Sequence, residues 1–217
     1  SGPGVNGRGA IINGSIRSQY NALRLVTLAG DTVFGGEVNS ARWDIRNTSG
    51  NGVFNMNDHS VAKVGSNQVG LTTVMVTPGG PSAAIDVQEG SFTVEAGTVM
   101  GGDSNNVVTV QGGAYFDIYD MTTPVLWSLV LNDNARFYVR LGNNTRNFWN
   151  GPVTLNGWTR LEANTGYYAT FGGPVSGPGQ MVKLGAGTIA FTNPANTYAG
   201  TTIISNGTLY VKHPGSL

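Results

Sequence analysis

Aromatic and polar side chains at alternate positions of short apolar stretches form the first candidate binding surface. Phe137 and Val139 fit a buried row, and strand geometry then turns Tyr138 and Arg140 to the outer side. Aromatic faces can stack on sugar rings while carboxylate and guanidinium groups bind hydroxyls, so such a row suits a linear polysaccharide. The alternative is an ordinary surface ladder that stabilises the sheet by about 0.2–1 kcal/mol per pair. The same alternation gives an exposed stripe of Asp117, Tyr119, Tyr138, Arg140 and Glu162.

A second group of aromatic residues lies in stretches rich in Asn and Gly, where no strand alternation assigns them to a core. Phe148 and Trp149 follow an asparagine-rich turn, and Trp158 stands in the next turn along the chain. Loop aromatics of this kind favour binding, and we expect Trp158 to line the same side as Trp149. Tyr167 and Tyr168 fall in a further loop and join the candidate set. The alternative is that Phe148 or Trp149 folds back and fills a gap beneath its own loop.

Catalytic and metal-binding patterns are weaker. Asp117 and Asp120 are the closest carboxylates that could act as acid and base in glycosidic cleavage, but 12 acidic residues in 217 produce such a pair by chance. His59 and His213 have no second ligand at metal-binding spacing, and the chain contains no cysteine. We therefore expect no enzyme activity, no metal and no cofactor, and we keep a polysaccharide lyase or hydrolase as the third alternative.

The composition excludes several classes of partner. Only 11% of the residues are charged, and 12 basic side chains balance 12 acidic ones. A neutral chain without a basic run argues against nucleic acid, whose phosphates need clustered Lys and Arg. No apolar run approaches the roughly 18–20 residues that span a bilayer, so we expect no membrane span. Abundant Asn, Thr, Gly and Ser with scarce Lys and Glu favour an extracellular protein.

The elements that must position these side chains are short strands that recur at a steady interval. Apolar-x-apolar units begin at positions 85, 108, 129, 153, 182 and 202, which differ by 23, 21, 24, 29 and 20 residues. Helix signals are nearly absent, and 33 glycines supply the turns. Two short strands per period of this length predict an all-β fold, a parallel β-helix of roughly 20–29-residue coils. A β-sandwich is the alternative, and the 29-residue interval predicts longer loops between residues 151 and 179.

Two other tryptophans are predicted to lie inside this solenoid. Trp43 shares the alternation of Ile45, and Trp127 shares that of Leu129. Alternate residues of each coil point inward, so these two indoles should fill the core rather than meet a ligand.

The C-terminal segment carries a motif that resembles a known family. The stretches KLGAGTI (183–189), NTYAGTT (196–202) and NGTL (206–209) resemble the autotransporter-associated β-strand repeat. This resemblance implies a right-handed parallel β-helix and export from a bacterial cell, hence a secreted or extracellular location. We expect residues 1–217 to form a single module of a larger, multimodular protein.

A second resemblance rests on architecture. Isolated β-helical modules of this size are similar to carbohydrate-binding modules of bacterial xylan-degrading enzymes. That similarity implies non-catalytic binding of a plant-cell-wall polysaccharide, xylan before others, beside a covalently linked catalytic module. The alternative function is a structural stalk or adhesin segment of a secreted autotransporter-type passenger, with no ligand of its own.

Overall fold

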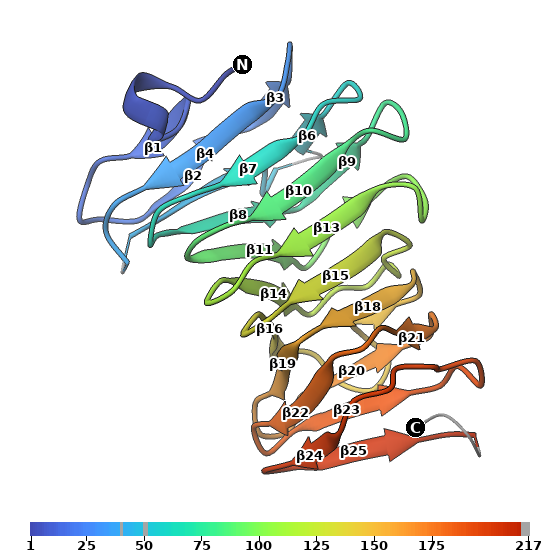
Figure 1. The fold of residues 1–217 in the computed structure, drawn as a ribbon. Coiled ribbons are helices and arrows are strands. Elements are labelled where there is room, and N and C mark those ends of the chain that lie inside the picture. The colour runs from blue at the N-terminus through green and yellow to red at the C-terminus, as the bar shows by residue number, and fades with distance from the viewer. Residues whose placement is uncertain (40, 50–51, 214–217) are drawn as a thin grey trace.

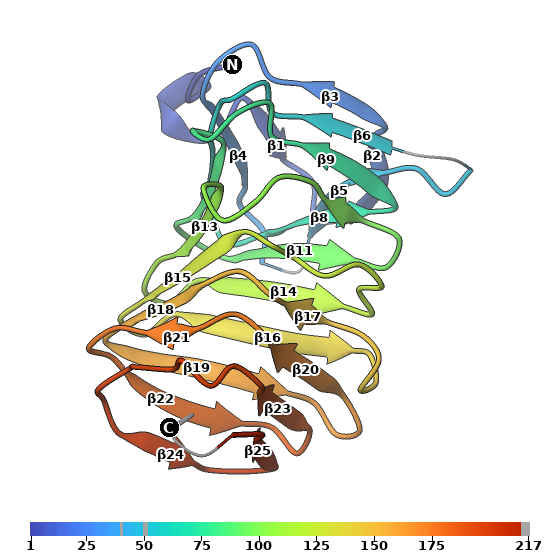
Figure 2. The ribbon, with the colours of Figure 1, turned by 90° about the vertical axis from the view of Figure 1, so that its right-hand side faces the viewer.

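The chain folds as a parallel β-solenoid of about nine coils, seen in a computed structural model that describes residues 1–39, 41–49 and 52–213. The coils stack from the N-terminal to the C-terminal end of an elongated molecule (Figures 1 and 2). Pairing is parallel in each of the four sheets, which confirms the predicted β-helix and excludes the β-sandwich. Residues 214–217 of the predicted module lie outside the described residues.

Two long sheets run the length of the solenoid and form two of its sides. Sheet I contains β1 (Ile11–Asn13), β4 (Thr32–Gly36), β7 (Val61–Lys63), β10 (Ala84–Val87), β13 (Val107–Val110), β15 (Ser128–Asn132), β18 (Val153–Asn156) and β21 (Val175–Ser176). Sheet II contains β2 (Gln19–Leu23), β5 (Arg42–Arg46), β8 (Gln68–Thr72), β11 (Ser91–Glu95), β14 (Tyr115–Tyr119), β16 (Arg136–Leu141), β19 (Trp158–Ala163), β22 (Gln180–Leu184) and β24 (Thr202–Ile204).

Two shorter sheets share the third side. Sheet III, in the N-terminal half, contains β3 (Leu25–Thr27), β6 (Gly52–Asn55), β9 (Val74–Thr77) and β12 (Val99–Met100). Sheet IV, in the C-terminal half, contains β17 (Phe148–Trp149), β20 (Tyr168–Phe171), β23 (Thr188–Phe191) and β25 (Thr208–Val211). Among the described residues the single helical element is the 3-10 turn η1 (Val5–Gly7).

Most coils therefore contribute three strands rather than the predicted two. The successive strands β7, β8 and β9, for example, enter sheets I, II and III in turn. The third side escapes the sequence pattern because some of its strands are very short: β12 and β17 have 2 residues each. An alternation cannot be recognised over so short a length.

The predicted long loops between residues 151 and 179 are wrong. Val153 lies in sheet I, whereas Val182 lies in sheet II, so the 29-residue interval joins strands on different sides. The register partner of Val153 is Val175, which is 22 residues later (175 − 153) and gives an ordinary coil. The longer coil stands upstream, where 29 residues separate Thr32 from its partner Val61.

The core consists of inward side chains aligned from coil to coil. Phe92, Phe116 and Phe137 stack in register with ring centroids 6.1 and 6.3 Å apart. Trp43 and Trp127 are buried as predicted, and their indole N–H groups donate to the carbonyls of Gly35 and Gly101 over 2.9 and 2.5 Å. Each large apolar side chain buried in this way contributes about 1.5–3 kcal/mol to stability.

Two lysines occupy inward positions among these apolar columns. Lys63 stands in register with Phe34 and Val87, and Lys183 stands in register with Leu161. Both side chains are completely buried. A buried ammonium is costly unless hydrogen bonds compensate it, so the surroundings of each amine decide how it is tolerated.

Backbone carbonyls supply that compensation in the same way at both sites. The Nζ of Lys63 donates to the carbonyls of Val64 and Gly65 over 3.0 and 2.7 Å, and to Glu89 of the next coil over 2.9 Å. Burial lowers the pKa of Lys63 to about 7, and the neighbouring Glu89 opposes that shift. Each lysine thus ties its own turn to the turn of the following coil.

Candidate functional site

The outer face of sheet II brings several predicted binding residues together. Asp117, Tyr138 and Glu162 stand in register on β14, β16 and β19, as the alternation predicts. The side chain of Arg140 is 41% exposed, and Tyr119 is 37% exposed. The predicted stripe therefore exists as a geometric row on one side of the solenoid.

Asp117 corrects that prediction in one respect, because it is buried rather than exposed. Arg140, from the following coil, folds across it and donates from Nε and Nη2 to Oδ2, each over 2.8 Å. The hydroxyl of Thr93 lies 3.3 Å from the same oxygen. Burial raises the pKa of Asp117, while Arg140 and Thr93 oppose that shift. Its Oδ1 has no hydrogen-bond partner among the described residues.

Tyr138 is engaged by the cations on either side of it in the sequence. The guanidinium carbons of Arg136 and Arg140 lie 4.2 and 4.7 Å from its ring centroid. Its hydroxyl donates to Oδ1 of Asn164 over 2.9 Å. Contacts of this kind contribute about 0.5–2 kcal/mol each, so a sugar ring that stacked on Tyr138 would compete with them.

A groove of about 360 Å³ lies beside this cluster on sheet II. The cation Arg136, which pairs with Glu162 over 2.5 Å and lies 5.1 Å from the ring of Tyr115, forms part of its wall. The complete lining is Asn39, Ser66, Gln68, Gly90, Ser91, Tyr115, Arg136, Tyr138 and Arg140. Of these residues, only Tyr138 and Arg140 are predicted from the sequence to bind a ligand. Tyr115 and Arg136 carry the same alternation one step before the inward phenylalanines, and this signal could have found them.

A second charged cluster lies on the same face nearer the N-terminal end. Asp44 is completely buried between Arg42 and Arg46, with N–O distances of 2.5 and 2.6 Å. Arg42 also reaches Glu95, two coils away, over 2.6 Å. Both guanidinium groups lie over the ring of Tyr20, 5.5 and 5.4 Å from its centroid. These charged groups therefore pair with one another, and their contacts connect the first coils.

The loop aromatics do not form one surface. Trp158 is 58% exposed at the start of β19 in sheet II. Trp149 lies in sheet IV and is buried, with its ring edge-to-face against Phe116 and Phe137 at 5.6 and 5.8 Å. The expectation that Trp149 is exposed and shares a side with Trp158 is wrong, because the chain after the asparagine-rich turn pairs as a short strand.

Three further candidates are partly buried near the same third side. Phe148 precedes Trp149 in β17 and has the opposite orientation. Tyr167 packs against the core, and Tyr168 begins β20. Burial raises the pKa of Tyr168, and nearby Tyr210 adds to the shift. None of these rings lines the groove on sheet II.

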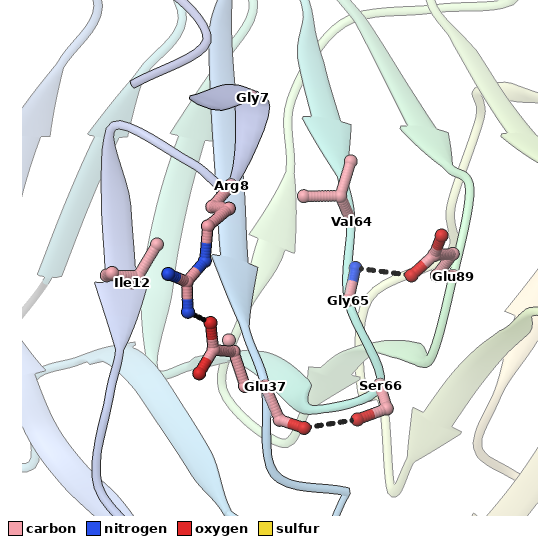
Figure 3. Close-up of a pocket in the computed structure, with 9 residues that line it drawn as sticks. Gly7, Arg8, Ile12, Glu37, Val64, Gly65, Ser66 and Glu89 are labelled. Atoms are coloured by element: carbon pink, nitrogen blue, oxygen red, sulfur yellow. Dashed lines mark hydrogen bonds and ion pairs between the residues drawn. The ribbon is translucent and has the colours of Figure 1, made fainter. Parts of the chain in front are cut away.

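A cavity of about 440 Å³ lies at the corner between sheets I and II near the N-terminal end (Figure 3). Arg8 and Glu37 form an ion pair across it, and both side chains are more than half exposed. The carboxylate of Glu89 accepts the N–H of Gly65 over 2.9 Å on the opposite side. Exposed pairs of this kind contribute about 0–1 kcal/mol, and no predicted binding residue lines the cavity.

The carboxylates considered for catalysis have separate partners. Asp117 pairs with Arg140, and Asp120 lies 3.6 Å from Arg146. Within the described ranges no group of three or more His, Cys, Asp and Glu side chains could hold a metal ion. In the same part of the chain no helix is long and apolar enough to cross a membrane.

Comparison with known families gives one match. Residues 181–211 match the family described as the passenger-associated transport repeat, a stretch that covers β22 to β25 in the last coils. Comparison with curated proteins and with solved structures gave no match. The match covers the same segment as the sequence motif that resembles the autotransporter-associated repeat.

The structure gives physical reasons for the matched motif. The Nζ of Lys183 donates to the carbonyls of Leu184, Gly185 and Asn206 over 2.6, 2.7 and 3.1 Å. Gly185 and Gly207 have φ of +70° and +73°, where a side chain would strain the turn. The Lys-x-Gly turn at Lys183 is therefore tied to the Asn-Gly turn of the next coil, at Asn206 and Gly207.

The tyrosine and asparagine of the motif anchor the intervening loop. Tyr198 is buried, with its ring 6.2 Å from that of Phe191 and its hydroxyl 2.6 Å from that of Thr202. The side-chain Oδ1 of Asn196 accepts the N–H of Val175 over 2.8 Å. Tyr198 and Asn196 therefore stabilise the packing of the coil and do not form an exposed binding surface.

Proposed function

We propose that this chain is a β-helical scaffold segment of a secreted bacterial passenger protein, with no catalytic activity of its own. The match of residues 181–211 to a passenger-associated transport repeat carries the proposal. The family's name links the repeat to transport of a passenger, and the same link is proposed here for this chain. The location that follows is the cell surface or the extracellular medium.

The fold supports a scaffold role. Each strand pairs only with its counterparts in adjacent coils, so the stability of the solenoid is close to a sum of neighbouring contacts. Such a molecule can fold coil by coil from one end and needs no distant segment to complete its core. The buried cores of coil after coil give a long, regular rod (Figure 2).

Protease accessibility on intact cells tests the location. Cells that produce the full-length protein are treated with protease, and an antibody against this segment follows its loss, with a cytoplasmic protein as the control. We expect the segment to be digested at the surface or recovered in the medium while the control survives. Retention of the segment inside intact, protected cells would refute the proposal.

Recognition of a polysaccharide by the outer face of sheet II is the second candidate. The observation that favours it is the polar groove beside Tyr115 and Tyr138, with Trp158 58% exposed on the same sheet. The expectation of xylan comes from architectural resemblance alone. Burial of Trp149 and the cation contacts of Tyr138 reduce the number of rings on which sugars could stack.

Affinity gel electrophoresis against xylan, glucan, mannan and pectin tests this candidate. Binding should retard the protein on at least one polymer, and Trp158→Ala should reduce the retardation if that ring contributes. Tyr210→Ala, an exposed ring at the C-terminal end, is the matched control. Equal mobility with and without every polymer would exclude polysaccharide binding and leave the scaffold role intact.

A further inference from the structure

We propose that the groove on sheet II binds an acidic saccharide, with Arg136 and Arg140 receiving its carboxylate. The inference rests on the second candidate function and narrows its ligand class. The expectation of xylan comes from resemblance, whereas the two arginines on the wall of the groove favour a ligand that carries a negative charge.

The charges on the wall have one sign. Arg136 and Arg140 line the groove, and its lining contains no Asp or Glu. Their partner carboxylates lie outside that lining: Asp117 is completely buried behind Arg140, and Glu162 belongs to the next strand. In the ion pair between Arg140 and Asp117, the carboxylate is buried and the arginine side chain is 41% exposed. The positive charge of the pair therefore faces solvent.

Part of the hydrogen-bonding capacity of both arginines is unused. Arg140 contacts Asp117 through Nε and Nη2, and Arg136 contacts Glu162 through Nη2. A guanidinium has five N–H donors, so the contacts with Asp117 and Glu162 do not use all the donors of either side chain. A guanidinium edge with free N–H groups is the geometry that receives a carboxylate.

The remaining lining suits a hydroxyl-rich ring. Gln68, Ser66 and Ser91 add amide and hydroxyl groups to the lining, and Tyr115 adds an aromatic ring. Nε2 of Gln68 donates to Thr93 and the hydroxyl of Ser66 to the carbonyl of Glu37, so their oxygens are the atoms left to accept from a ligand. The volume of about 360 Å³ is near the lower end of known ligand pockets and fits one or two sugar residues. A uronic acid combines the required carboxylate with several hydroxyls, so a uronate residue of an acidic polysaccharide matches both parts of the wall.

Isothermal titration of the folded chain with trigalacturonate, xylotriose and inorganic phosphate tests the proposal. We expect trigalacturonate to bind at least about tenfold more tightly than either other probe, the change that one charge-assisted hydrogen bond produces. Equal binding of xylotriose would overturn the acidic ligand while sustaining polysaccharide recognition. Equal binding of phosphate would reduce the groove to a general anion site, and absence of trigalacturonate binding would also overturn the proposal.

Variants separate the groove from the rest of the sheet. Gln68→Glu places a carboxylate on the wall without removing an ion pair, and it should weaken trigalacturonate binding about tenfold. The double variant Asp117→Asn with Arg140→Gln removes both partners of the buried pair and should have at least the same effect. Arg160→Gln, on the same outer column but outside the groove, should leave the affinity unchanged. Unchanged binding in Gln68→Glu, with circular dichroism equal to wild type, would overturn the assignment.

Discussion

Replacement of Lys183 by methionine is the sharpest test of how the repeat holds its coils together. Methionine keeps most of the apolar stem but removes the ammonium that donates to the carbonyls of Leu184, Gly185 and Asn206. Leu184 and Gly185 are half-buried and Asn206 is exposed, and a carbonyl that loses its donor costs about 1–3 kcal/mol where water cannot replace that donor. Relief from burying a charge offsets part of this loss, so we take the lower value for each carbonyl.

The two half-buried carbonyls, of Leu184 and Gly185, at about 1 kcal/mol each give an expected loss of about 2 kcal/mol in the free energy of unfolding, because water can reach the exposed Asn206. Urea denaturation followed by circular dichroism at about pH 6 measures the total effect. Hydrogen exchange of the amides in β24 and β25 measures its location, because Asn206 belongs to the last coil. We expect exchange to accelerate there before it changes in the N-terminal coils.

Lys212→Met is the matched control, since Lys212 is an exposed lysine in the same final coil. Exposed substitutions of this kind stay within about 0.5 kcal/mol of wild type. If Lys183→Met were no more destabilising than Lys212→Met, the carbonyl-binding role of the buried ammonium would be refuted.

Two other predictions follow from the burial of single side chains, and a third follows from the backbone conformation of one glycine. Burial lowers the pKa of Lys63 to about 7 against about 10.4 in an unfolded chain, so the unfolded chain binds more protons between these values. The free energy of unfolding from urea denaturation should therefore rise between about pH 7 and pH 10, and Lys63→Met should flatten that rise. Trp149→Ala should lose about 3–5 kcal/mol in the same assay, whereas Trp158→Ala should lose less than about 0.5; equal losses would contradict their opposite burial. Gly207→Ala should reduce the free energy of unfolding by more than about 1 kcal/mol, because the backbone at Gly207 has a φ of +73°, which a side chain strains. An unchanged free energy of unfolding would contradict the turn geometry.

The alternation of side chains made the solenoid predictable, and it also placed individual residues. Trp43 and Trp127 were expected in the core from their neighbours alone, and both are buried. Tyr138 and Glu162 were expected on one outer face, and they stand in register there. Parity along a strand is fixed by local backbone geometry, so one sequence contains this information.

Contacts between coils are harder to predict from the sequence. Asp117 has the predicted outer orientation, yet Arg140, 23 residues later, covers it completely. The sequence predicts a loop at Trp149, because a strand of two residues shows no alternation. Val182 was aligned with the wrong strands because an apolar spacing does not say on which of three sides a strand lies.

The buried lysines show a signal that could have been used. Lys63 and Lys183 each stand two residues after an inward or core residue and two before a glycine with positive φ, Gly65 and Gly185. A charged residue at an inward position followed by such a glycine indicates a corner whose carbonyls need a donor. The pattern can be interpreted only when the structure shows that a carbonyl of the next coil also accepts a hydrogen bond from the lysine.

Export of the full-length protein with Lys183→Met and Gly207→Ala combined is the measurement that tests the central claim most directly. If the last coils serve as the transport repeat of a passenger, the amount at the cell surface or in the medium should fall relative to wild type, while Lys212→Met is exported normally. Normal export of the double variant, with its last coils shown by hydrogen exchange to be unfolded, would contradict the claim.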